Sequence, residues 1–308
     1  MIPSSMSAGS APLAIRITDV EKSFGAVQAN RGASLEVPVG EIHALVGENG
    51  AGKSTLMRIL GGMFAPDGGR VEVAGRDVTG WTTAQAIDAG VGMVHQHFML
   101  VPTLTVAENV VLGREPRRQG VLLDRARAER EVAELSARTG LAVEAGRRVS
   151  ELSVGEAQRV EILKTLFRGA RVLILDEPTA VLSPPEVAEL WTVLRGLRRG
   201  GATIVLITHK LDEVIEISDA ITVMRAGRTV ERMRTADTTP AAIARAMVGR
   251  DVLLPGDAAA MGAAPGSLAE GGGVPTAGGP GGPPPTGKVA PNAAPAAIDS
   301  LRAGPNDR

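Results

Sequence analysis

The stretch Gly47-Glu48-Asn49-Gly50-Ala51-Gly52-Lys53-Ser54-Thr55 decides the fold of this chain, because it matches the phosphate-binding pattern G-x-x-x-x-G-K-[ST] at every position. Glycine and other small residues let successive backbone N–H groups face one concavity, and Lys53 supplies a positive charge for the outer phosphates. A glycine-rich turn that binds nothing is the alternative interpretation. The flanking sequence distinguishes the two.

The flanks supply the strand and the helix that a phosphate-binding loop requires. Before the loop, Ile42-His43-Ala44-Leu45-Val46 is a short, largely apolar run typical of a buried parallel strand. After it, residues 54–60 predict a helix that ends at Gly61-Gly62 and places its N-terminus under the phosphates. This order favours a nucleotide site in an α/β fold.

The composition is that of a globular protein. Of the 308 residues, 44% are hydrophobic, which is enough for the core of one large or two modest domains. The 33 basic and 34 acidic residues leave a formal net charge of -1, so no global charge favours nucleic acid. Cysteine is absent, which excludes disulfides and thiolate metal sites, and no apolar run has the length of a membrane span. We therefore expect a cytoplasmic protein.

Composition also predicts the domain boundaries. Residues 1–12 are small and polar, and residues 256–308 are rich in glycine, proline and alanine, so we expect both ends to be disordered. Residues 13–255 then form the nucleotide-binding domain. Alternating runs at 13–20 and 33–37, followed by a hairpin over 70–78, predict an antiparallel β subdomain.

The middle of this domain, about residues 97–169, predicts an inserted α-helical subdomain. A capping box at Thr105 opens a short helix, and an arginine-rich helix runs from about residue 124 to Gly140. Its arginines alternate with glutamates, which favours a solvated helix face over contact with nucleic acid. A second capping box pairs Ser153 with Glu156 and opens another helix, which by itself indicates only a well-capped helix.

Two further apolar strands end in polar side chains. Val172-Leu173-Ile174-Leu175 leads into Asp176 and Glu177, and Thr203 to Thr208 leads into His209. Strands this apolar are expected in the middle of a parallel sheet, where their carboxyl ends lie beside the phosphate loop. Neighbouring strand residues point in opposite directions, so Asp176 can bind magnesium while Glu177 addresses a water molecule. His209 is expected to contact phosphate rather than to be structural.

Two aromatic residues have contrasting interpretations. Phe24 lies between the first two strands, where it could stack on an adenine ring or be a buried core contact. Trp191 repeats at helical spacing with leucines in a helix that begins after Ser183, and we expect it in the core. A last hairpin is expected around Ala226-Gly227, followed by a helix that ends at Gly249.

With these motifs in order, residues 13–250 resemble the nucleotide-binding subunits of ATP-binding cassette (ABC) transporters. The resemblance implies a P-loop NTPase with a mixed central sheet, an antiparallel β subdomain and an inserted α-helical subdomain. The landmarks are Phe24 as the adenine-stacking aromatic, Gly47 to Thr55 as the Walker A loop, Gln96 as the Q-loop glutamine, Leu152 to Gln158 as the family signature, Asp176 and Glu177 as Walker B, Ala180 to Ser183 as the D-loop, and His209 as the switch histidine.

The resemblance implies ATP and Mg²⁺ as ligands and ATP hydrolysis as the reaction. Lys53 and the loop amides hold the phosphates, Ser54, Gln96 and Asp176 organise Mg²⁺, and Glu177 polarises the attacking water, with Gln96 and His209 sensing the γ-phosphate. Each site of this family is closed by the signature of a second cassette, so Ser153, Gly155 and Glu156 are expected to act on the partner's nucleotide. Val154 and Ser183 replace a glycine and an aspartate that are usual in the family.

The motifs His95 to Leu100, Leu152 to Glu156 and Thr179 to Ser183 more narrowly resemble the N-terminal cassette of importers for nucleosides and simple sugars. The expected role is the energy-coupling ATPase of such an importer, at the cytoplasmic face of the membrane. Its partners are permease subunits, a second cassette and, indirectly, an extracytoplasmic solute-binding protein. That subfamily has two cassettes in tandem, which leaves open a fragment, a half-size subunit or a degenerate copy. The alternative functions are a soluble ABC ATPase of translation or DNA repair, or a regulator that does not hydrolyse ATP.

Overall fold

The computed structural model describes residues 12–118 and 122–249. The expectations for the tail at 256–308 and for the N-terminus, except Pro12, lie outside these residues. Among the described helices, none combines the length and apolar character that crossing a bilayer would require.

A six-stranded mixed sheet forms the centre of the described domain, in the order β12-β11-β3-β10-β9-β6. Five strands are mutually parallel, and β12 pairs antiparallel with β11. The strands are β3 (Ile42–Val46), β6 (Val91–Val94), β9 (Val172–Asp176), β10 (Thr203–Ile207), β11 (Ala220–Arg225) and β12 (Arg228–Arg234). Every residue of β3, β9 and β10 is buried, as their continuous apolar runs predicted.

The predicted antiparallel subdomain is a four-stranded sheet in the order β2-β1-β4-β5. It consists of β1 (Leu13–Phe24), β2 (Val27–Pro38), β4 (Gly68–Val73) and β5 (Arg76–Asp77). Both β1 and β2 extend beyond the alternating runs from which they were predicted. The β4–β5 hairpin turns at Ala74 and Gly75, whose φ angles of 48° and 75° are both left-handed, as a tight hairpin requires.

The helices flank the sheet and fill the segment between β6 and β9. They are α1 (Lys53–Leu60), α2 (Thr83–Asp88), α3 (Val106–Val111), α4 (Arg125–Thr139), α5 (Val154–Phe167), α6 (Pro184–Arg199), α7 (Leu211–Ile217) and α8 (Pro240–Val248). The remaining elements are a two-stranded sheet and two 3₁₀ turns. The sheet pairs β7 (Arg117–Arg118) with β8 (Leu122–Leu123), and the turns are Val149–Glu151 and Thr235–Asp237. Besides β7, β8 and the two 3₁₀ turns, three elements have no counterpart in the sequence prediction, namely α2, β6 and α7.

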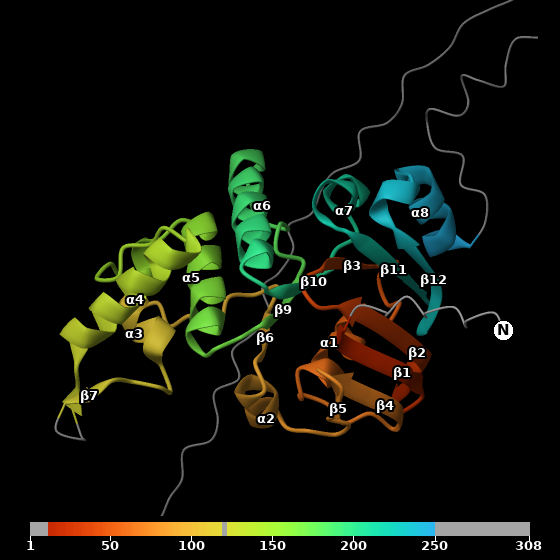
Figure 1. Cartoon of the computed structure of the whole chain (residues 1–308), viewed down its shortest axis with the longest axis horizontal. Helices are drawn as coiled ribbons and strands as arrows, with labels where there is room; N and C mark the ends of the chain where they lie inside the picture. The colour runs from red at the N-terminus through yellow and green to blue at the C-terminus, as the bar shows by residue number, and fades with distance from the viewer. Residues whose placement is uncertain (1–11, 119–121, 250–308) are drawn as a thin grey trace, which may run out of the picture. The chain divides into compact units, whose positions relative to one another are not determined.

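The inserted helical segment has the predicted character. Helices α3, α4 and α5 lie together (Figure 1), and their apolar faces share one buried cluster with β9, β10 and α6. The capping boxes predicted at Thr105 and Ser153 are both present. Trp191 is fully buried in this cluster, which confirms its core position.

Candidate functional site

The phosphate loop is packed against two other parts of the chain, and this packing explains its glycines. A Cβ atom at Gly47 would collide with the backbone oxygen of Met224 in β11, and one at Gly52 would collide with the backbone oxygen of Ala29 in β2. Gly52 also has a left-handed φ of 94°, a conformation that side chains disfavour. The loop is therefore held between the two sheets of the domain.

Polar contacts fix the carbonyl groups of the same loop. The side-chain Nδ2 of Asn30 donates to Gly52 O at 3.2 Å, and Gly227 N donates to Ala51 O at 3.1 Å. Asn30 is fully buried, and its Oδ1 has no hydrogen-bond partner. Sequence reasoning missed this residue, although a lone asparagine in an alternating strand is a signal of a buried polar contact.

Lys53 lies inside the loop at the start of α1. Its Nζ donates to Gly47 O at 2.7 Å and to Glu48 O at 3.0 Å, and the residue is 7% exposed. Burial lowers the pKa of Lys53, while the charges of Glu177 and Asp176 act in the opposite direction. Helix α1 has no side-chain cap. Its first N–H groups are therefore available to an anion.

Asp176, the last residue of β9, and Glu177, which follows it with a left-handed backbone, have different partners, as predicted, but strand alternation does not explain the difference because Glu177 lies outside the strand. Asp176 is buried, and its Oδ1 accepts a hydrogen bond from Ser54 Oγ at 3.4 Å. Burial is the main cause that raises the pKa of Asp176, and the neighbouring charge of Glu177 adds to it. A buried carboxylate of this kind gains from a nearby cation.

Glu177 joins two other predicted residues into one cluster. Its Oε2 lies 3.1 Å from Gln96 Nε2, and its Oε1 lies 3.0 Å from His209 Nδ1. The backbone of Glu177 is left-handed, with φ of 48°, and its N–H bonds to Ile207 O at the end of β10. Such a conformation is uncommon for a residue with a side chain and is found at functional sites. Gln96 follows the unpredicted strand β6, which brings it to the same edge of the sheet.

These groups border a cavity of 630 Å³. Its wall includes the loop from Asn49 to Thr55 together with Phe24, Gln96, Glu177 and His209. Phe24 is 44% exposed, so the alternative of a buried core contact is wrong. Its ring meets Phe64 edge-on at 5.2 Å, which leaves an apolar surface at the mouth of the cavity. The volume and the mixed lining suit an aromatic base joined to phosphates.

The signature residues lie elsewhere in the domain. Ser153 caps α5, accepting a hydrogen bond from Glu156 N at 3.2 Å, while Glu156 Oε2 accepts one from Ser153 N at 2.7 Å. The Arg147 guanidinium holds Glu156 in a two-bond fork and is the main cause that lowers the pKa of Glu156 to about 2. Ser153, Gly155 and Glu156 do not line the cavity at the phosphate loop.

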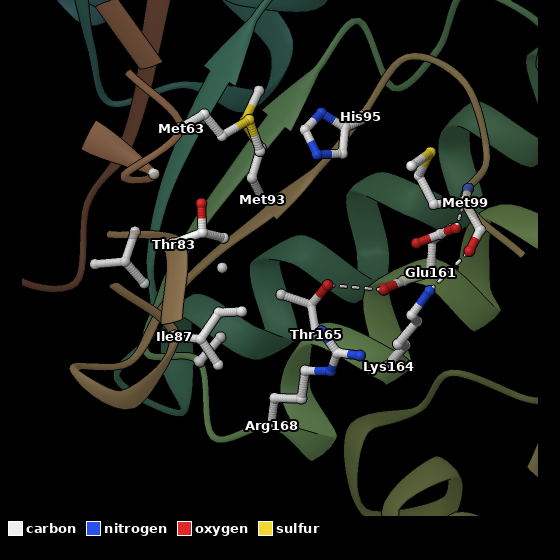
Figure 2. Close-up of a pocket in the computed structure, with 14 residues that line it drawn as sticks. Met63, Thr83, Ile87, Met93, His95, Met99, Glu161, Lys164, Thr165 and Arg168 are labelled. Atoms are coloured by element: carbon white, nitrogen blue, oxygen red, sulfur yellow. Dashed lines mark hydrogen bonds between the residues drawn. The ribbon is translucent and has the colours of Figure 1, made fainter. Parts of the chain in front are cut away.

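A second cavity, of 330 Å³, lies between the β6 side of the sheet and helix α5 (Figure 2). Its lining combines methionines with the polar groups of α5 (Met63, Met93, Met99, Glu161, Lys164 and Arg168), and His95 of the segment after β6 also borders it. The partly buried His95 has a pKa lowered mainly by desolvation and also by Arg58. This cavity could not be predicted from the sequence, because α2 and β6, which form part of its wall, were not predicted.

Comparison with known proteins agrees with this fold. The sequence model of the family described as "ABC transporter" matches residues 30–180. The nucleoside import ATP-binding protein NupA of Lactococcus lactis is 50% identical over 238 residues, which are 77% of this chain and 47% of that protein. The ribose import ATP-binding protein RbsA 1 of Streptomyces avermitilis is 47% identical, over 77% of this chain and 45% of its own length.

Among solved structures, the ADP conformation of an ATP-binding cassette of an ABC transporter superposes with a TM-score of 0.66 at 25% identity. The match covers 76% of this chain and 94% of that one. The chain carries the ATP-binding domain of the ABC transporter family. It spans about half the length of the curated relatives it matches.

Proposed function

We propose that this chain hydrolyses ATP and couples the reaction to the import of nucleosides or simple sugars. The observation that carries the proposal is that Lys53 and the Glu177 cluster border one cavity together with Ser54, whose hydroxyl donates a hydrogen bond to Asp176. These groups follow four parallel strands, β3, β6, β9 and β10, and they match the needs of phosphoryl transfer to water. Relatives named for the import of nucleosides and ribose support the solute class.

The donor set at the loop fits Mg²⁺. Ser54 and Asp176 present a hydroxyl and a carboxylate oxygen 3.4 Å apart, and Gln96, whose amide oxygen could serve as a further ligand, borders the same cavity as Ser54. Within residues 12–118 and 122–249, no group of three or more His, Cys, Asp or Glu side chains could hold a metal ion alone. This suits magnesium, which keeps few protein ligands and shares its coordination with phosphate oxygens. When bound, the ion supplies positive charge that polarises the phosphoryl oxygens.

The protein side chains divide the remaining work. Lys53 has three N–H bonds, of which two go to loop carbonyls, so one remains for a phosphate oxygen. The N-terminal amides of α1 bind the same anion. Glu177 orients and polarises the attacking water, while Gln96 and His209 hold the two oxygens of its carboxylate. Phe24 stacks on the base.

We further propose that a second cassette completes each site. Ser153, Gly155 and Glu156 stand at the N-terminus of α5 and are directed toward a nucleotide held by the partner. Two apolar side chains next to these motifs support an interface, because Val154 is 43% exposed and Val181 of the D-loop is 59% exposed. A cassette alone is then a poor ATPase.

The cavity of Figure 2 is the proposed docking site for a permease subunit. Exposed Met63 and Met99 at its edge offer adaptable apolar contacts, and Arg168 adds positive charge. A short permease helix with an apolar and an acidic side chain suits this lining. The chain is then peripheral at the cytoplasmic face of the membrane, and an extracytoplasmic solute-binding protein acts on it indirectly through the permease. No nucleic acid is part of this scheme.

The Glu177→Gln variant tests the proposed reaction. We expect wild-type ATP turnover that rises with protein concentration, and in the variant an ATP-bound dimer without turnover, detected by light scattering. Asp212→Asn, an exposed carboxylate near His209, is the matched control and should behave as wild type. Unchanged turnover in Glu177→Gln would refute the role of Glu177.

The alternative functions predict other results. A regulator that does not hydrolyse ATP would bind the nucleotide without turnover in the wild-type chain. A soluble ATPase of translation or DNA repair would hydrolyse ATP but would not be stimulated by permease subunits in reconstituted vesicles.

A further inference from the structure

Two side chains of helix α5 hold the backbone of Met99 in the segment that follows Gln96. The carboxylate of Glu161 accepts a hydrogen bond from Met99 N, and Lys164 Nζ donates to Met99 O at 2.8 Å (Figure 2). Glu161 and Lys164 are one helical turn apart, so both reach the same residue. Both polar groups of the Met99 backbone are therefore bonded to one helix.

The same segment is held again two residues later. Asn109 of α3 accepts a hydrogen bond from Val101 N at 2.7 Å and donates one to Val101 O at 3.0 Å. Asn109 is fully buried, and Glu161 is 6% exposed. Buried polar side chains that bond to a loop backbone, rather than to each other, fix the position of that loop. We call the contacts of Glu161, Lys164 and Asn109 with residues 99–101 the backbone clasp.

The clasp connects the two ends of the proposed ATPase machinery. Gln96, three residues before Met99, bonds to Glu177 at the nucleotide cavity. Helix α5 is continuous from Val154 to Phe167, and at about 1.5 Å per residue Glu161 stands roughly 12 Å from Ser153 along its axis. A rigid helix passes a displacement at Glu161 to its N-terminus.

We propose that Glu161 and Lys164 are positioning residues through which a movement of the Gln96 segment at one nucleotide displaces the N-terminus of α5, which carries Ser153 and Gly155. The inference rests on the proposed function, because it assigns these residues to communication between the two sites of a cassette pair. Asn109 anchors the same segment to α3, so α3 and α5 move together with it. The clasp needs no contact between Glu161 or Lys164 and the nucleotide.

The double variant Glu161→Gln/Lys164→Met tests the clasp with little change in volume. The measurement is hydrogen exchange of the full chain, with and without Mg²⁺ and a non-hydrolysable ATP analogue, at a concentration where light scattering shows a monomer. In the wild-type chain we expect the analogue to change exchange at residues 96–101 and at residues 152–157. In the double variant we expect affinity for the analogue within about twofold, the change at 96–101 retained, and the change at 152–157 reduced at least about fivefold.

The matched control is Glu189→Gln, which removes the 2.7 Å ion pair between Arg159 of α5 and Glu189 of α6 without touching Met99. It should respond as wild type. The inference is overturned if the double variant keeps the response at 152–157, if the control loses it equally, or if the wild-type chain binds the analogue without any response there. Failure of the wild-type chain to bind the analogue is a separate result, which refutes the proposed function and with it the clasp. Each single variant, measured in the same way, shows whether the carboxylate or the ammonium carries the larger share.

Discussion

Removal of the Arg147 fork should loosen the N-terminus of α5 by a predictable amount. Arg147 Nη1 and Nη2 each lie 2.7 Å from an oxygen of Glu156, and both side chains are 27% exposed. Hydrogen bonds to charged groups contribute about 1.5–3 kcal/mol when shielded from water, whereas exposed ion pairs contribute about 0.2–1 kcal/mol. The intermediate exposure places Arg147→Met at roughly 1 kcal/mol of lost stability, or about 2–4 °C in Tm for a domain of this size.

The pH dependence gives this prediction a sharper test. The fork lowers the folded-state pKa of Glu156 from 4.5 to about 2, so its contribution is complete above about pH 4.5 and is lost as pH falls toward 2. Urea unfolding of wild type and Arg147→Met should therefore differ most at neutral pH, and the difference should shrink below about pH 4.5 and nearly vanish at about pH 2. Arg148→Met, at the exposed neighbouring residue, is the control. An equal stability difference at both pH values would refute the reasoning.

Three further variants test the loop and its supports. Asn30→Leu removes the hydrogen bond to Gly52 O together with a buried acceptor that has no partner. We therefore expect the free energy of unfolding to change by less than about 1 kcal/mol, while the affinity for nucleotide falls about three- to tenfold. A lowered Tm with unchanged affinity would contradict this expectation. Gly52→Ala forces a Cβ onto the Ala29 carbonyl, and fluorescent-nucleotide titration should show at least about a tenfold loss, or 1.4 kcal/mol. Ser153→Ala removes the cap of α5, and thermal unfolding should show a loss of about 1 kcal/mol.

Most of the central sheet could be predicted from the sequence because its inner strands are uniformly apolar. Strands β3, β9 and β10 were placed correctly, together with the polar residues at their carboxyl ends. The hairpin at Ala226-Gly227 and the helix that ends at Gly249 are also confirmed. In each case, the local sequence pattern, an apolar run or a turn or cap residue, favours the same structure as the tertiary packing around it.

The missing elements have weak local signals. Strand β6 is only four residues long and contains Gly92, because a side chain there would collide with Thr165 of α5. Helix α2 has six residues and α7 has seven, too short for a clear helical period. Because β6 was missing, the position of Gln96 came from family resemblance alone. The partners of Asn30 and Glu161 lie 22 and 62 residues away in sequence, so a local pattern can signal a buried polar contact at Asn30 but cannot identify the partner of either residue.

Ser183 and Val154, the two residues that depart from the usual family motifs, differ in what they change: Ser183 removes a charge, and Val154 adds apolar surface. Ser183 stands at the N-cap of α6, where its N–H and its hydroxyl both donate to the Glu186 carboxylate, at 2.8 and 2.6 Å. What the chain lacks there is a negative charge, not a helix cap. Val154 likewise occupies the first turn of α5 without disturbing the capping box, and its side chain is 43% exposed. Neither substitution disturbs the fold of one cassette, so their effect is expected at the proposed contact with a second cassette, where lost charge and added apolar area both change the interaction.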